Sequence, residues 1–130
     1  MFHLDTDTVI AFLNGNQKVT DAIKAHLPDI AISSLVFAEL LFGARASARC
    51  DENIEKLNRM LSIIEVVDFD LECARTYSED RLSLKQKGRP TGEMDLLIGS
   101  VALTRGSILV THNTKHFQHI DGLLLDDWSV

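Results

Sequence analysis

The sequence contains little cysteine and too few basic residues to balance its acidic ones. Its two cysteines, Cys50 and Cys73, lie in separate stretches with a helical pattern and have no metal-ligand spacing, so we interpret them as reduced thiols. Lys and Arg number 13 against 19 Asp and Glu, and the net charge of −6 excludes binding to nucleic acid through bulk positive charge. Any contact with nucleic acid must be local, and we expect a metal ion to bridge it.

A long hydrophobic run is also missing. The longest, at residues 96–103, is too short to span a membrane and contains Gly99 and Ser100. No signal peptide is visible, so we expect a cytoplasmic protein with no membrane partner. The rest of the composition, 45% hydrophobic and 25% charged over 130 residues, is typical of a globular protein, and we expect one domain over residues 1–130.

Short apolar runs alternate with amphipathic ones along the chain. The apolar runs predict strands at residues 2–4, 30–32, 63–67, 107–110 and 123–125. Helical periodicity predicts helices at residues 6–13, 18–26, 35–45, 51–62 and 68–86, and a further one that Thr91 caps and Arg105 closes. Strands that alternate with helices predict an α/β fold, with a mostly parallel central sheet of four to five strands in a three-layer α/β/α arrangement.

Two of the predicted helices carry specific expectations. In the helix at residues 68–86, the side chains expected to face the core are Leu71, Ala74, Tyr77 and Leu82. The helix at residues 35–45 is apolar almost all round, with Glu39 as the only charge before Arg45 at its end. Such a helix is covered on more than one side, and in so small a domain we expect the second cover to be another subunit. The candidate interface residues are Leu35, Phe37, Leu41 and Phe42.

Four polar residues are expected at or just after the carboxyl end of a strand, or in the first turns of a helix: Asp5, Glu39, Asp95 and Asn113. Parallel strands bring such positions to one edge of the sheet, where open sheets bind their ligands. Three carboxylates gathered there repel one another unless a cation lies between them. Their oxygen atoms suit Mg²⁺ or Mn²⁺, which can activate water for attack on a phosphodiester.

Each of these residues also has a simpler interpretation when it is taken singly. Asp5 could cap a helix, and Glu39 could be a solvated charge. Asp95 could complement a helix dipole, and Asn113 could be a turn residue. The combination therefore carries more information than any of its members.

Four sequence blocks surround these residues. Residues 4–7 read LDTD, and residues 33–44 (SSLVFAELLFGA) place a strand-end Ser before an Ala-Glu-Leu helix. Residues 91–99 (TGEMDLLIG) place an Asp before a Leu-Ile-Gly run, and residues 110–117 (VTHNTKHF) are the fourth block, which the closing segment at residues 125–128 (LDDW) follows. In this order and over the whole chain, the blocks resemble those of the PIN-domain ribonucleases, and in particular the VapC toxins of bacterial VapBC toxin–antitoxin pairs.

The resemblance implies a metal-dependent endoribonuclease that is the toxin of a type II toxin–antitoxin pair. Asp5, Glu39 and Asp95 would ligate one or two Mg²⁺ or Mn²⁺ ions, while Thr111 and Asn113 would orient a ligand or water. Metal-activated water would cut tRNA or another structured RNA, leaving a 5′-phosphate and a 3′-hydroxyl. The resemblance further implies a homodimer and a VapB-like antitoxin that reaches into the acidic site with a basic side chain.

Two positions depart from the family pattern. Asp7 stands where the family usually has Asn, so it could join the metal ligands or only cap the helix. Asn113 stands where many PIN nucleases have Asp, and a neutral side chain there weakens a second metal site. Glu93 lies two residues before Asp95, so the two face different ways on a helix and Glu93 is the less expected ligand.

Cationic and imidazole side chains accompany the third and fourth blocks. The candidates for contact with the RNA backbone are Lys85, Lys87, Arg89 and Lys115, each of which could equally be a solvated loop residue. His112, His116 and His119 look like a zinc cluster by composition. Because the loop lacks Cys and an HExxH-type helix, we do not expect zinc.

Two other functions fit parts of the sequence. Residues 5–9 (DTDTV) match the motif of haloacid-dehalogenase-type phosphatases, in which Asp5 would be the phospho-accepting nucleophile and Asp7 the acid/base. That function leaves Glu39 and Asp95 unexplained. The second is a catalytically silent module that only binds a regulatory partner. Such a module is expected to have lost one of the site carboxylates, but Asp5, Glu39 and Asp95 are all present.

Overall fold

The computed structural model of this chain describes residues 1–89 and 91–130. Within them, five strands form one sheet in the order β3-β2-β1-β4-β5, and every neighbouring pair is parallel. The strands are β1 (Phe2–Leu4), β2 (Ile30–Ser33), β3 (Glu65–Val67), β4 (Ile108–Val110) and β5 (Leu125–Asp126). Because β1 is central, the residue that follows it emerges at the middle of the sheet's carboxyl edge.

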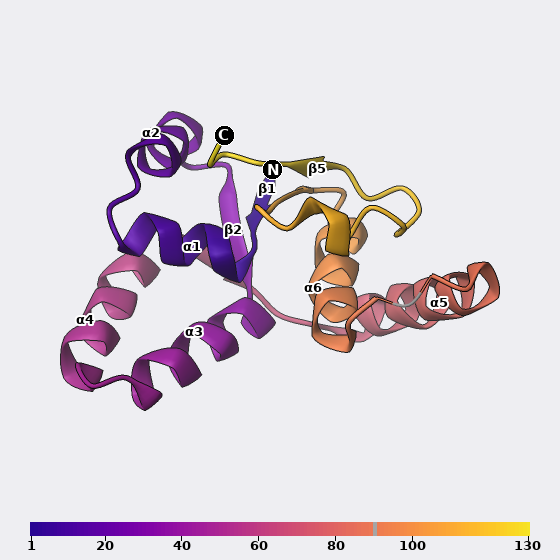
Figure 1. Cartoon of the computed structure of the whole chain (residues 1–130), viewed down its shortest axis with the longest axis horizontal. Coiled ribbons are helices and arrows are strands. Elements are labelled where there is room, and N and C mark those ends of the chain that lie inside the picture. Colours follow the sequence, from indigo (N-terminus) through magenta and orange to yellow (C-terminus); the bar gives the residue numbers. More distant parts are fainter. Residues whose placement is uncertain (90) are drawn as a thin grey trace.

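Helices cover this sheet on two sides. They are α1 (Thr6–Leu13), α2 (Gln17–His26), α3 (Ser34–Ala46), α4 (Cys50–Leu61), α5 (Leu71–Lys87) and α6 (Glu93–Thr104), with a short 3₁₀ helix η1 at Thr114–His116. In Figure 1, α1, α2 and α4 lie to the left of β1 and β2, α3 runs below these strands, and α5 and α6 lie to the right. The predicted three-layer α/β/α arrangement around a parallel sheet is confirmed. No helix in the described ranges is long and apolar enough to cross a membrane.

Polar side chains start two of the helices directly at strand ends. Asp5 Oδ1 accepts a hydrogen bond from the Thr6 backbone N–H at 2.8 Å, which caps α1. Ser33 Oγ accepts one from the Val36 N–H at 3.2 Å, which caps α3. These tight connections fix where the first turns of α1 and α3 lie relative to the sheet edge.

Close packing places α6 beside the segment that follows β4. A Cβ atom added at Gly99 would lie 2.9 Å from Ile120 Cδ1 and 3.4 Å from Leu123 Cδ2, so a larger residue would require these side chains to shift. Phe117, in the same segment, is fully buried. The absence of a side chain at Gly99 therefore lets the middle of α6 pack closely against the segment at residues 117–123.

The predicted core face of α5 is confirmed for Tyr77, which packs against the core, and wrong for Leu71 and Leu82. Leu71 and Leu82 are 68% and 56% exposed, whereas Cys73 and Leu84 are buried. Cys73 and Leu84 are 11 residues apart, close to three full turns, so both lie on the stripe that the helix turns inward. The many charged residues of α5 make its apolar periodicity weak, and the sequence pattern therefore assigned two exposed leucines to the core face.

Several element boundaries also differ from the prediction. Gly92 rather than Thr91 is the N-cap of α6, and it makes no side-chain capping bond. β3 begins at Glu65, because Ile63 lies in the preceding turn and is exposed. β5 covers Leu125–Asp126, two residues later than the start that the apolar run predicted.

Candidate active site

Asp5 occupies the centre of the carboxyl edge of the sheet. Its side chain is enclosed, with 6% of the residue exposed. Oδ1 accepts the capping bond from Thr6, and Oδ2 accepts a hydrogen bond from Thr111 Oγ1 at 2.8 Å. The capping role considered from the sequence is therefore confirmed, and one carboxylate both caps α1 and is held by a residue from the far end of the chain.

Burial raises the pKa of Asp5 to about 6, from an ordinary value of 3.8. The negative charges of Asp7 and Asp95 raise it as well, while the hydrogen bonds from Thr111 and Thr6 oppose the rise. Three carboxylates are thus close enough to interact electrostatically, and the ionised state of Asp5 is disfavoured. A cation placed beside Asp5 would instead favour the ionised form of its carboxyl group.

Thr111 and Asn113 follow β4 and reach the same region. Thr111 is fully buried, donates to Asp5, and accepts a hydrogen bond at its Oγ1 from the Asn113 backbone N–H at 3.0 Å. The Asn113 side chain is exposed, and its Nδ2 donates to Asp7 Oδ2 at 3.0 Å. Thr111 therefore orients Asp5, and Asn113 contacts Asp7 instead of the other carboxylates.

Asp7 lies in the first turn of α1. Its Oδ2 accepts from the His112 backbone N–H at 3.2 Å as well as from Asn113. Asp7 therefore fastens the loop at residues 111–113 to α1, a role that was not considered from the sequence, and its possible role as a metal ligand stays a prediction.

Glu39 projects from the second turn of α3 and is half-buried. Its Oε1 accepts a short hydrogen bond, 2.5 Å, from Thr6 Oγ1. Thr6 therefore donates to Asp5 through its backbone and to Glu39 through its side chain, and one residue links the two carboxylates.

Asp95 lies in the first turn of α6, and its side chain is 30% exposed. Its Oδ2 is 3.2 Å from Nδ1 of His116 in η1. A Cβ added at Gly92 would approach the same oxygen to 3.4 Å, so the chain just before α6 passes close to this carboxylate. Glu93 points elsewhere, toward Tyr77 and Arg81 of α5.

The donor chemistry of this region fits a divalent cation, because buried carboxylate oxygens face neighbours of the same charge and Thr111 adds a hydroxyl. No group of three or more His, Cys, Asp or Glu side chains that could hold a metal ion occurs within residues 1–89 and 91–130. Thr6 links Asp5 to Glu39, and Asp5 interacts electrostatically with Asp95, but the three carboxylates do not form a closed set of ligands.

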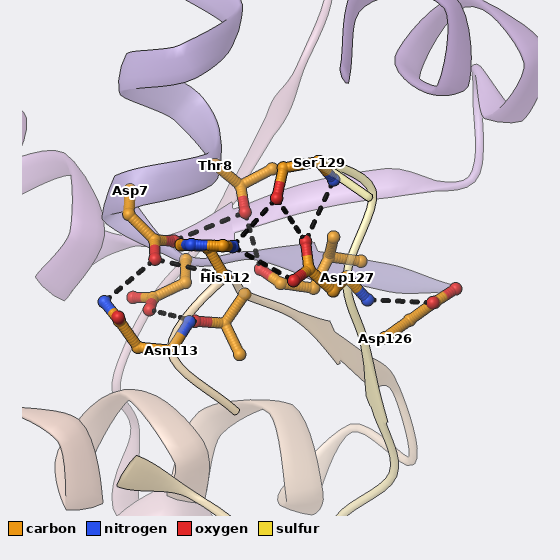
Figure 2. A network of polar contacts seen from close by, with 10 residues as sticks. Asp7, Thr8, His112, Asn113, Asp126, Asp127 and Ser129 are labelled. Carbon is orange, nitrogen blue, oxygen red and sulfur yellow. Dashed lines mark hydrogen bonds and ion pairs between the residues drawn. The ribbon is translucent and has the colours of Figure 1, made fainter. Parts of the chain in front are cut away.

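A network around His112, which the sequence did not reveal, supports the loop at residues 111–113. Figure 2 shows Asp127 and Ser129 together on one side of the His112 ring, and Asp7 and Asn113 on the other side. His112 Nδ1 lies 3.1 Å from Asp127 Oδ2 and 2.9 Å from Ser129 Oγ, and Ser129 Oγ also donates to Asp127 Oδ1 at 2.6 Å. Only the acidic pair at residues 126–127 could have drawn attention to this segment.

The three histidines that suggested a zinc cluster point to different partners. His112 contacts Asp127 and Ser129, and His116 contacts Asp95. His119 lies beside Gln118, with 3.5 Å between the side-chain nitrogens. Their side chains take part in separate contacts.

The candidate RNA-binding cations do not form one group. Lys85 and Arg89 line a hollow of about 560 Å³ between α5 and the start of α6. Lys87 Nζ is instead 2.5 Å from Asp121 Oδ1, in an ion pair on another side of α5. Lys115 is exposed in η1, two residues after Asn113.

The candidate interface residues of α3 differ in their exposure to solvent. Leu35, Phe37 and Leu41 are half-buried and pack against the core of this chain. Phe42 is 74% exposed. Phe42 is therefore the apolar side chain of this set that the fold of one chain leaves most accessible.

Comparisons with known proteins agree with this architecture. A family model described as "PIN domain" matches residues 3–123. "Ribonuclease VapC2" from Rickettsia felis is 44% identical over 99 residues, 76% of this chain and 74% of that protein. "tRNA(fMet)-specific endonuclease VapC" from Shigella flexneri is 34% identical over 129 residues, 98% of each chain. The solved structure of VapBC2 from Rickettsia felis bound to a DNA fragment from their promoter has a TM-score of 0.92 at 36% identity, covering 98% of both chains.

Proposed function

This chain belongs to the PIN-domain family, among the VapC ribonucleases, and from that membership we propose that it hydrolyses RNA with a divalent metal ion held by Asp5, Glu39 and Asp95. The family resemblance inferred from four sequence blocks is confirmed, and with it the interpretation as a nuclease of the VapC toxin type. The metal ion, the site residues and the RNA substrate are the proposed part.

The observation that carries the proposal is the state of Asp5. Its carboxylate is buried and held by two hydrogen bonds, yet its pKa is raised to about 6 by burial and by neighbouring carboxylates. A site built only for stability would gain from an uncharged residue there. Carboxylates gathered against their own repulsion are suited to binding a cation, which Asp5, Glu39 and Asp95 would hold.

The chain's own residues then have separate tasks. Thr111 holds Oδ2 of Asp5, and Thr6 holds Glu39, so two of the carboxylates are oriented before substrate arrives. Asn113 is anchored to Asp7, which keeps the loop at residues 111–113 beside the site. A bound Mg²⁺ or Mn²⁺ would supply activated water and offset the charge that develops on the phosphate.

We propose tRNA as the substrate class, because the Shigella flexneri relative is named a tRNA(fMet)-specific endonuclease. RNA hydrolysis favours the cytoplasm as the location. We also propose a VapB-like antitoxin as partner, since the Rickettsia felis relative was solved as a VapBC complex. The proposed homodimer uses α3, where Phe42 is exposed.

The phosphatase alternative fits the contacts less well. Both Asp5 oxygens accept hydrogen bonds in an enclosed position, and Asp7 is engaged by His112 and Asn113. An in-line nucleophile and a mobile acid/base need freer side chains than these. The family match removes the remaining support for this function.

The experiment is cleavage of total RNA by purified protein without antitoxin, in Mg²⁺, Mn²⁺ or EDTA, beside Asp5→Ala. We expect discrete fragments with 5′-phosphate and 3′-hydroxyl ends that disappear with EDTA and in the variant. Cleavage that persists in EDTA would contradict the metal-dependent mechanism. Turnover of p-nitrophenyl phosphate without RNA cleavage would restore the phosphatase alternative, and a folded protein that cleaves neither substrate would favour the silent module.

A further inference from the structure

We propose that the hollow between the C-terminal turns of α5 and the start of α6 binds the phosphate backbone of the RNA strand beside the cleavage site. This inference rests on the proposed ribonuclease function. The hollow has a volume of about 560 Å³, and the lining residues that matter here are Tyr77, Arg81, Lys85, Arg89, Thr91 and Glu93. We call it the α5–α6 hollow.

The charge of the α5–α6 hollow is opposite to that of the whole chain. The chain has a net charge of −6, whereas Arg81, Lys85 and Arg89 line the hollow against the single carboxylate of Glu93. Arg81 pairs with Glu93 at 3.8 Å. Among residues 1–89 and 91–130, no carboxylate lies within ion-pairing distance of Lys85 or Arg89. Two cations without a protein partner in one hollow are suited to phosphate.

The hollow borders the candidate active site. Thr91 and Glu93 line it, and Gly92 between them passes so close to Asp95 that an added Cβ would lie 3.4 Å from Asp95 Oδ2. One short backbone segment therefore separates the hollow from a proposed metal ligand. An RNA strand whose scissile phosphate lies at Asp95 can continue over this segment into the hollow.

The structure divides the basic residues that are adjacent in the sequence. Lys85 faces the hollow, whereas Lys87, two positions later, pairs with Asp121. Residues two apart on a helix do not share a face. Arg81 joins Lys85 because the two are four residues apart, and Tyr77 lies one further turn back, with its ring 5.9 Å from the Arg81 guanidinium. Cations beside an aromatic ring are typical of sites for single-stranded nucleic acid.

The test measures binding of a fluorescent oligouridine of about 12 nucleotides by anisotropy, in EDTA and over a range of salt concentrations. The variant is Lys85→Ala/Arg89→Ala in the full-length chain. Loss of two phosphate contacts is expected to reduce the slope of log K against log salt by about 1.4, and affinity in about 0.1 M salt by roughly 10- to 30-fold. Lys85→Arg/Arg89→Lys is expected to restore both values.

A matched variant controls for general loss of charge. Lys18→Ala/Lys24→Ala removes two exposed cations from α2. This variant is expected to bind the oligouridine with nearly the wild-type salt slope. Thermal unfolding of every variant identifies any misfolded one, and the single variant Lys85→Glu, with an expected loss of affinity, then replaces the double variant.

An unchanged slope for Lys85→Ala/Arg89→Ala, or an equal loss in the α2 control, would overturn the proposal. Competition by polyglutamate as strong as competition by unlabelled RNA would also overturn it, in favour of an acidic peptide as the ligand. If wild-type protein cleaves RNA while the hollow variants bind normally, the hollow proposal fails and the ribonuclease function stands. If wild-type protein neither binds nor cleaves RNA, both fail.

Discussion

The ionised carboxylate of Asp5 lowers the stability of the native state, and a residue with a purely structural role would not need to be ionisable. Its pKa of about 6 against an ordinary 3.8 means that the native state holds a proton more tightly than the unfolded chain. This contribution to stability is complete below pH 3.8 and is lost as the pH rises through 6. The difference between the two values corresponds to about 3 kcal/mol, so metal-free protein at neutral pH should be destabilised by this one group.

We therefore predict that Asp5→Asn stabilises the metal-free protein above pH 7 by up to about 3 kcal/mol while abolishing RNA cleavage. Asn still accepts the capping bond from Thr6, so α1 is preserved. Urea unfolding of wild type and variant at several pH values measures the effect, and the two curves should converge toward pH 4. A variant less stable than wild type at neutral pH would contradict this interpretation of the site.

Asp7 should tolerate replacement by its amide. In Asp7→Asn, the side-chain oxygen can still accept from the His112 N–H and from Asn113 Nδ2, so the loop at residues 111–113 stays attached to α1. We predict cleavage within a few-fold of wild type for Asp7→Asn and a clear loss for Asp7→Ala, measured as single-turnover rates. Complete inactivity of Asp7→Asn in a folded protein would indicate that the negative charge itself is required.

The segment at residues 127–129 supports the candidate active site indirectly, through His112. Asp127 and Ser129 hold the His112 ring, and the His112 backbone holds Asp7 (Figure 2). We predict that Asp127→Ala/Ser129→Ala lowers kcat by about tenfold with little change in KM, because the polar contacts that support the site residues are lost. Asp126→Asn, which leaves the His112 contacts in place, should cleave normally; equal activity in all three proteins would remove any positioning role.

The exposure of the α3 side chains decides which substitution can test the proposed dimer contact. Leu41 packs against the core, so Leu41→Glu would disturb the fold as well as any interface. Phe42 is exposed, and Phe42→Glu is predicted to convert a dimer into a monomer without loss of thermal stability. Light scattering measures the mass, with Leu124→Glu as the control because Leu124 is similarly exposed outside α3. An unchanged mass for Phe42→Glu would place the subunit contact elsewhere or show that there is none.

Helices and strands with clear capping residues and a regular apolar pattern were predictable from the sequence, and elements without them were not. The prediction of a helix at residues 6–13 is correct to the residue, because Asp5 caps it and Asn14-Gly15 ends it. The inward face of α5 was predicted only in part, with Leu71 and Leu82 assigned to it wrongly, because charged residues surround its few apolar ones. Strand order could not be read either, since β1 contacts both β2 and the distant β4, and local pattern carries no information on such pairing.

For the whole molecule, the sequence indicated which carboxylates approach one another but not what joins them. Parallel strands bring Asp5, Glu39 and Asp95 to one region, as topology requires. The links through Thr6 and Thr111, and the support of His112 by Ser129, depend on side-chain contacts between distant segments. Such contacts follow from the packed fold and leave no periodic signal in the sequence.

The central claim is that Asp5, Glu39 and Asp95 hold a divalent cation, and calorimetric titration with Mn²⁺ tests it most directly. Wild-type protein and Glu93→Gln should bind the ion with equal affinity, because the Glu93 side chain faces α5. Glu93 is a matched control because it is an acidic residue only two positions before Asp95. Asp95→Asn should bind it at least about tenfold more weakly while staying folded. Equal binding by Asp95→Asn and wild type, or no binding by folded wild-type protein, would contradict the account.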